Sequence, residues 1–163
     1  MKNKKYELLK DDAITYFGRT LYRIKATTDF GDVKKGHLGG YIEKVENLSH
    51  DGNAWVYCNA EVSGNAKVYG NARVSDDACV SGNARVSDDA CVSGNACVSG
   101  NAKVYGNAKV YGNAWVSGNA KVYGNARVYG NAWVYCNAEV SGNAEVSGNA
   151  KVYGNARVYG NAW

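Results

Sequence analysis

The chain of 163 residues has no proline and a single methionine beside 20 glycines, a biased composition typical of a repeat or a low-complexity segment. It also lacks any apolar run near the roughly 20 residues that span a bilayer, which excludes a transmembrane helix. The basic N-terminus, MKNKKYELLKDD, lacks the apolar segment that a signal peptide requires. We therefore expect a cytoplasmic protein that does not enter a membrane.

Cysteine and histidine are too few and too scattered for a disulfide framework or a zinc site. The cysteines are odd in number and none forms a CxxC pair: Cys58, Cys79, Cys91, Cys97 and Cys136. No Ser-His-Asp spacing, phosphate-binding loop or paired acid can be recognised. We expect no catalytic residue, metal or cofactor. The net charge of +4 permits an acidic partner without requiring one.

A six-residue repeat fills the chain from Gly52 onward. Valine recurs at every sixth position from Val56 to Val158, alanine stands two positions before each valine, and Gly-Asn usually separates the units. In an extended strand, Ala and Val two apart point to one side and the two variable residues point to the other. Gly and Asn tolerate positive φ, so they predict a sharp corner after each strand of about four residues.

A chain that runs straight for four residues and then turns must coil. Three sides give a triangular prism with roughly 18 residues per turn, in which valine fills the lumen and alanine leaves room. Backbone hydrogen bonds would join successive coils about 4.8 Å apart, and the valines suffice for about six coils. The sequence thus predicts an all-β parallel solenoid. The alternative, a disordered low-complexity tract, conflicts with the unbroken inward period.

The A-x-V-x-G-N unit resembles the repeat of the hexapeptide-repeat superfamily over residues 53–163. The small residue two positions before the aliphatic one and the asparagine three positions after it both match. The resemblance implies a left-handed parallel β-helix. The left hand comes from the family, because general crossover rules favour the right hand.

Residues 1–50 differ from the repeat and are predicted to form a β cap and lead-in, ahead of the β-helix at 51–163. KYELL and AITYFGRTLYRIKA, with a turn at Gly18-Arg19 after Phe17, indicate a small antiparallel hairpin. The spacing of Ile42 and Leu48 suggests that coiling starts early with larger inward residues, and a solenoid needs a cap over its first edge.

Outward residues should stack in columns because the period is 18. One column is basic apart from Glu139 and contains Lys67, Arg85, Lys103, Lys121 and Arg157. Beside it run tyrosines interspersed with serines: Tyr69, Tyr105, Tyr123 and Tyr159. Cations that hold phosphate and rings that stack on bases predict binding of an acidic ligand or nucleic acid. Alternatively, these side chains only solvate a sheet.

Other outward positions carry weaker signals. Trp115 and Trp133 stand one coil apart on another face, as a contact patch or as a ladder that shields the sheet. Cys79 and Cys97 are also neighbours across coils, and we expect them to be inert. Asp76-Asp77 and Asp88-Asp89 replace Gly-Asn at two corners on different edges, which argues against a shared cation site.

We favour a non-catalytic solenoid that binds a ligand or acts as a scaffold. The combination of cap and repeats resembles small bacterial and prophage hexapeptide-repeat proteins, some labelled acetyltransferases by superfamily alone, so an acyl(acetyl)transferase is the alternative. Such enzymes use a histidine base at a trimer junction, often beside a loop thrown out of the coil. Here the hexads run without insertion, and His37 and His50 lie in or near the cap. His50 falls at a hexad valine position and is predicted to face inward.

The sequence stops within a repeat, at Trp163. The last coil is expected to expose backbone groups and the end of its lumen around Val146, Val152 and Val158. We therefore expect a homo-oligomer, first as a two-fold dimer joined end to end and second as a side-by-side trimer. A monomer whose last coil frays is the remaining alternative.

Overall fold

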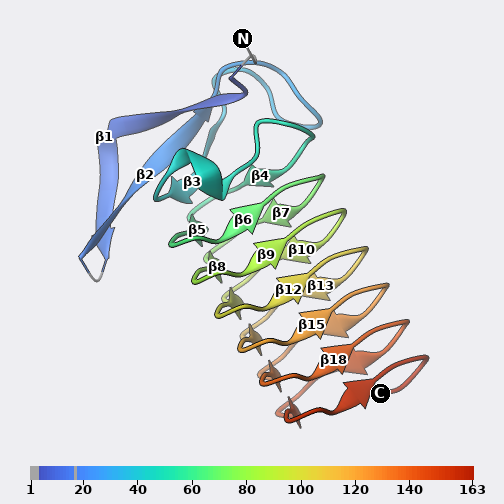
Figure 1. Ribbon diagram of the computed structural model, residues 1–163. Helices are drawn as coiled ribbons and strands as arrows, with labels where there is room; N and C mark the ends of the chain where they lie inside the picture. Colours follow the sequence, from blue (N-terminus) through green and yellow to red (C-terminus); the bar gives the residue numbers. More distant parts are fainter. Residues whose placement is uncertain (1–3, 17) are drawn as a thin grey trace.

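A computed structural model describes residues 4–16 and 18–163. In this part of the chain, short strands wind into coils that stack along one axis, so that equivalent strands of successive coils form three sheets, with a β-hairpin at the N-terminal end (Figure 1). Apart from one 3-10 helix, η1 at Val45–Asn47, every regular element described is a strand. None of the described helical structure is long and apolar enough to cross a membrane. The predicted all-β solenoid with an antiparallel N-terminal sheet is confirmed.

The three sheets form the three faces of the prism. The cap face has the strand order β1 (Tyr6–Tyr16), β2 (Arg19–Ala26), β3 (Leu38–Ile42), β5 (Glu61–Val62), β8 (Cys79–Val80), β11 (Cys97–Val98), β14 (Trp115–Val116), β17 (Trp133–Val134) and β20 (Lys151–Val152). The mixed face contains β4 (Trp55–Val56), β7 (Arg73–Val74), β10 (Cys91–Val92), β13 (Lys109–Val110), β16 (Arg127–Val128) and β19 (Glu145–Val146). The basic face contains β6 (Lys67–Val68), β9 (Arg85–Val86), β12 (Lys103–Val104), β15 (Lys121–Val122), β18 (Glu139–Val140) and β21 (Arg157–Val158).

Valine pairs with valine from one coil to the next, as the period predicts. Val92 is in parallel register with Val110, and Val98 with Val116. The cap face has seven parallel strands from β3 to β20, one more than the six coils expected from the valines alone. The lead-in supplies the difference, because Ile42 is in register with Val62 and begins the first coil.

Each side of a coil is a two-residue strand, shorter than the four residues predicted. The reason is a turn hydrogen bond that closes most of the corners. The Ala60 amide donates to the Tyr57 carbonyl three residues earlier, at 3.1 Å, and the Ala84 amide donates likewise to Ser81 at 3.3 Å. The alanine and the second variable residue therefore belong to the corner, although the alanine side chain still enters the lumen.

Glycine alone adopts positive φ in the regular Gly-Asn corner. Gly112, for example, has φ 69°, and a Cβ there would stand 3.0 Å from the Gly130 amide of the next coil. Asparagine was predicted to share this conformation, but its side chain has another role. The Asn83 amide donates to the Asn101 side-chain oxygen at 3.1 Å, and Asn101 donates to Asn119 at 3.2 Å. These hydrogen-bonded ladders link successive coils along the edges of the prism.

The lumen is filled by valine and alanine, which are fully buried from Ala54 to Ala144. Val146 and Val152 remain buried, whereas Val158 is only partly covered. Ala150 and Ala156, on the last coil, are exposed, although Val152 and Val158 keep the register of the preceding coils. In an array of this kind, each residue is covered by the coil beyond it.

The N-terminal hairpin extends the cap face beyond the first coil. β1 and β2 pair antiparallel, as predicted, with Gly18 at φ 74° in the turn; Phe17 lies outside the described residues. β3 pairs antiparallel with β2 on one side and parallel with β5 on the other, so the two kinds of sheet are continuous (Figure 1). Gly40 permits this junction, because a Cβ there would collide with the Ala60 carbonyl oxygen.

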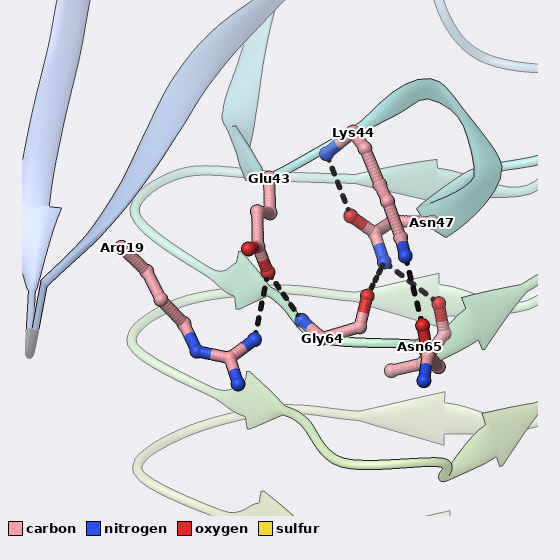
Figure 2. Close-up of polar contacts among 7 residues, drawn as sticks. Arg19, Glu43, Lys44, Asn47, Gly64 and Asn65 are labelled. Carbon is pink, nitrogen blue, oxygen red and sulfur yellow. Dashed lines mark hydrogen bonds and ion pairs between the residues drawn. The ribbon is translucent and has the colours of Figure 1, made fainter.

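Polar side chains fasten the lead-in to the second coil (Figure 2). The Glu43 carboxylate accepts hydrogen bonds from the Gly64 amide at 2.5 Å and from Arg19 Nη1 at 3.0 Å. Asn47, buried in η1, donates through Nδ2 to the carbonyls of Gly64 at 3.1 Å and Ala66 at 2.9 Å. These bonds satisfy backbone groups that the irregular lead-in would otherwise leave unpaired.

Lys5, which directly precedes β1, is buried. Its Nζ donates to the Ala54 carbonyl at 2.7 Å and to the Gly52 carbonyl at 3.3 Å, and it lies 4.7 Å from the centre of the Phe30 ring. Burial, partly opposed by the charge of Asp51, lowers the pKa of Lys5 from 10.5 to about 8. The charged form of Lys5 is therefore less favourable in the folded state than in the unfolded chain.

A charge in the lumen should disrupt the array. Val110 is fully buried, whereas the side chain of Lys109 beside it is exposed. We expect Val110→Asp to cost about 4 kcal/mol or more in unfolding free energy, because it removes apolar burial and places an unpaired carboxyl group in the lumen. Lys109→Asp is the matched control and should change stability by less than about 1 kcal/mol. Chemical denaturation followed by circular dichroism measures both, and equal stabilities would contradict the assigned lumen.

Stability should rise with pH between about 8 and 10. In this range the unfolded chain keeps a proton on Lys5 that the folded protein has begun to lose, so rising pH favours folding by roughly 1–2 kcal/mol. Above about pH 10 the trend reverses, because burial raises the pKa of Tyr6 and the unfolded chain loses the tyrosine proton first. Urea unfolding of the wild type and Lys5→Met measures the effect. Lys5→Met should lose most of the increase in unfolding free energy over this pH range. An equal increase in both proteins would refute the assignment of the effect to Lys5.

Candidate functional site

Four predicted cations lie on adjacent strands of the basic face. Lys67 is in register with Arg85, Arg85 with Lys103, and Lys103 with Lys121. The side chains of Lys67, Arg85 and Lys103 are exposed, and that of Lys121 is half-buried. Neighbouring strands in a sheet are about 4.8 Å apart, so the four charges form a line roughly 14 Å long. We call this set of four residues the basic column.

The charge of the fifth predicted cation, Arg157, is compensated. Glu139 stands between Lys121 and Arg157 in the register, and its Oε2 lies 3.8 Å from Arg157 Nε. The same carboxylate oxygen accepts a hydrogen bond from the Tyr123 hydroxyl at 3.3 Å. The run of consecutive cations in the register therefore ends at Lys121.

Two of the four tyrosines beside the basic column stack on each other. Tyr105 and Tyr123 have ring centres 5.0 Å apart and an interplanar angle of 2°. Ser87, between Tyr69 and Tyr105 in the column, is buried, whereas Tyr159 at the far end is 69% exposed. The facing surfaces of the stacked pair are covered and the Tyr123 hydroxyl bonds Glu139, so neither facing surface is available to stack on a ligand. Charge is thus the stronger feature of this face.

A cavity of about 600 Å³ opens where the lead-in overhangs the basic column. Lys67, Arg85 and Tyr69 line it from the prism, and the segment Val45–Asp51 lines it from the lead-in, including Glu46 and His50. Leu48 bridges to Val68 in the sheet and so holds this segment above the column. The cavity was not predicted from the sequence, because the spacing of Ile42 and Leu48 indicated only that coiling starts early.

The tryptophans lie on a different face from the basic column. Trp115 and Trp133 are in register on the cap face and stack with ring centres 5.3 Å apart. Lys151 Nζ lies 5.6 Å from the Trp133 ring centre on the next strand. The two tryptophans remain 44% and 42% exposed. The predicted ligand-binding residues therefore form two separate surfaces.

The two histidines pack against aromatic residues of the cap. His50 was predicted to face inward at a hexad position, but Leu48 is the lumen residue there, because eight residues rather than six separate it from Val56. The half-buried His50 ring stacks on Tyr6 at 4.2 Å, and its Nδ1 accepts a hydrogen bond from the Lys5 amide at 3.1 Å. The His37 ring meets Trp55 edge to face, with ring centres 6.5 Å apart.

The acidic corners and the last coil have separate surroundings. Asp76 and Asp88 take the glycine position at φ 60° and 58°, and each carboxylate accepts an amide hydrogen bond from the next coil, at Gly94 and Gly106 respectively. They lie on different edges, as predicted. At the other end, Trp163 is 97% exposed. Self-association through the predicted surface of Val146, Val152, Val158 and Trp163 stays a prediction.

A family model described as the YdcK beta solenoid repeat matches residues 66–82, 102–118, 120–135 and 150–163. Each segment is close to one coil long, and together they cover less than half of the chain. A search of curated proteins finds no match. Membership of the hexapeptide-repeat superfamily, and the left hand that it implies, stay predictions. Over the matched coils the chain is similar to the YdcK beta solenoid repeat, in agreement with its parallel solenoid architecture.

Proposed function

We propose that the protein is a non-catalytic solenoid scaffold that binds a polyanionic ligand along the basic column. One observation carries the proposal. Lys67, Arg85, Lys103 and Lys121 are consecutive in the register of one sheet, and no carboxylate stands between them in that register.

This arrangement has a cost for the folded protein. Like charges directly opposite each other in a sheet are destabilising. At a separation of about 4.8 Å in water, each neighbouring pair repels by roughly 1 kcal/mol before salt screening. A row of anionic groups along the column would remove this repulsion and release counterions. The column is thus better suited to holding an anion than to stabilising the prism.

The mixed face is a useful comparison, because its arginines are balanced within the protein. Arg73 Nη2 lies 2.8 Å from the Asp32 carboxylate, and Arg127 Nη1 lies 3.8 Å from that of Glu145. The outward column of the mixed face has three cations, whereas that of the basic face has five, and each column contains one glutamate. The basic column is thus distinguished both by the number of its cations and by the position of the carboxylates.

The regular spacing favours a polymer over a single small molecule. Cations at a constant interval present similar contacts to successive anionic groups, and a flat face accepts an extended chain. Such binding is electrostatic, tolerant of sequence and strongly dependent on salt. A nucleic acid strand and a sulfated polysaccharide share this chemistry. Both are suitable probes for the same face.

Neutralising the centre of the column should weaken binding. We expect Lys103→Gln combined with Lys121→Gln to reduce affinity for heparin and for a single-stranded oligonucleotide about tenfold at low salt. The slope of log affinity against log salt should also fall by about 1–2, because two ionic contacts are lost. Fluorescence anisotropy over a series of salt concentrations measures both quantities.

The matched control is Lys109→Gln combined with Arg127→Gln on the mixed face. It makes the same change in net charge at two positions that are also in register. Binding should stay within about twofold of wild type. If both double variants lose affinity equally, overall charge and not the column is responsible. No binding of either probe by the wild type at low salt would refute the proposed function.

A further inference from the structure

Two cysteine side chains stand next to each other on the cap face, away from the basic column. Cys79 on β8 and Cys97 on β11 are direct register partners in parallel strands. Both are half-buried, so solvent and small reagents still reach them. Their neighbours in the same column are Glu61 before Cys79 and Trp115 after Cys97.

The Cα spacing of the pair is compatible with a disulfide. Paired strands hold opposing Cα atoms about 4.8 Å apart, which is inside the range of about 4.4–6.8 Å found in disulfides. The two side chains also have similar orientations. Cys79 Sγ lies 3.8 Å from the Asp77 carbonyl oxygen, and Cys97 Sγ lies 3.9 Å from that of Asn95, two residues earlier in each case. The sulfur atoms therefore stand side by side.

The pair is also chemically asymmetric. A hydrogen bond from Cys79 lowers the pKa of the Cys97 thiol to about 7, despite an opposing effect of burial. The same interaction, together with burial, raises the pKa of Cys79. Cys97 thus ionises first, and its thiolate is the nucleophile in exchange with disulfides.

We propose that Cys79 and Cys97 form a dithiol site that is oxidised reversibly by a small disulfide such as oxidised glutathione. The Cys97 thiolate attacks one glutathione sulfur, which breaks the S–S bond and releases one glutathione thiolate. Cys79, after losing its proton to solvent, attacks Cys97 Sγ and releases the second glutathione. Two protein thiols and one oxidised glutathione become one protein disulfide and two reduced glutathiones.

The remaining cysteines lack such a partner in the register. Cys91, on the mixed face, is paired with Arg73 on one side and with Lys109 on the other. Cys58 and Cys136 occupy exposed corners at positive φ, with φ 56° and 62°. Cys91 is the sharpest control, because it is half-buried in a two-residue strand like those of the pair.

Peptide mapping after equilibration in glutathione buffers tests the site. Trypsin cleaves after Arg73, Arg85 and Lys103, so Cys79 is released in peptide 74–85, while Cys91 and Cys97 share peptide 86–103. Oxidation should link the two peptides and lower their combined mass by two hydrogens. The protein is equilibrated over a series of ratios of oxidised to reduced glutathione, quenched with acid and digested under denaturing conditions.

Wild type and Cys91→Ser should give the linked peptides to the same extent, and added reduced glutathione should separate them. Cys97→Ser should give none. The proposal is overturned if Cys97 only acquires glutathione at every ratio, or if the link disappears in Cys91→Ser. None of these outcomes depends on polyanion binding, which takes place on another face.

Discussion

Backbone hydrogen bonds between successive coils are the constraint on which the rest of the structure depends. In each regular unit, three amides donate to the coil beyond. The Lys103 amide bonds the Ala120 carbonyl at 3.0 Å, Tyr105 bonds Val122 at 3.0 Å, and Asn107 bonds Gly124 at 2.8 Å. Every bond spans the same number of residues, so the register repeats without drift. Each side chain is then placed directly over its equivalent one coil away.

This stacking sets the properties of every face. It is favourable for Tyr105 on Tyr123 and for the amide ladders, but it also brings like charges together along the basic column. On the mixed face, Asp32 and Glu145 balance the arginines, whereas the four cations of the basic column are consecutive in the register and Glu139 follows the last of them. Because the constant register stacks equivalent residues of successive coils, the side chain that each coil contributes decides whether a face is neutral, aromatic or basic.

The unbroken valine period was sufficient to predict the parallel solenoid, its lumen and the membership of each outward column. Features that depend on hydrogen bonds within a corner could not be read from that period, which is why the strands proved shorter and the asparagines had another role. The ion pair of Glu139 with Arg157 and the cavity above Lys67 were missed for a related reason. The ion pair depends on the conformation of two side chains, and the cavity depends on the path of an irregular segment. A periodic sequence pattern predicts neither.

The most direct test of the central claim is the distance between spin labels placed along one column. In a background with the native cysteines replaced by serine, labels at Lys67→Cys and Arg157→Cys are five coils apart in the register. Pulsed electron paramagnetic resonance should give a narrow distribution near 24 Å, and moving the second label from 157 to 139 should shorten it by about 5 Å. A broad distribution at much longer distances, or no shortening between the two pairs, would contradict the stacked register.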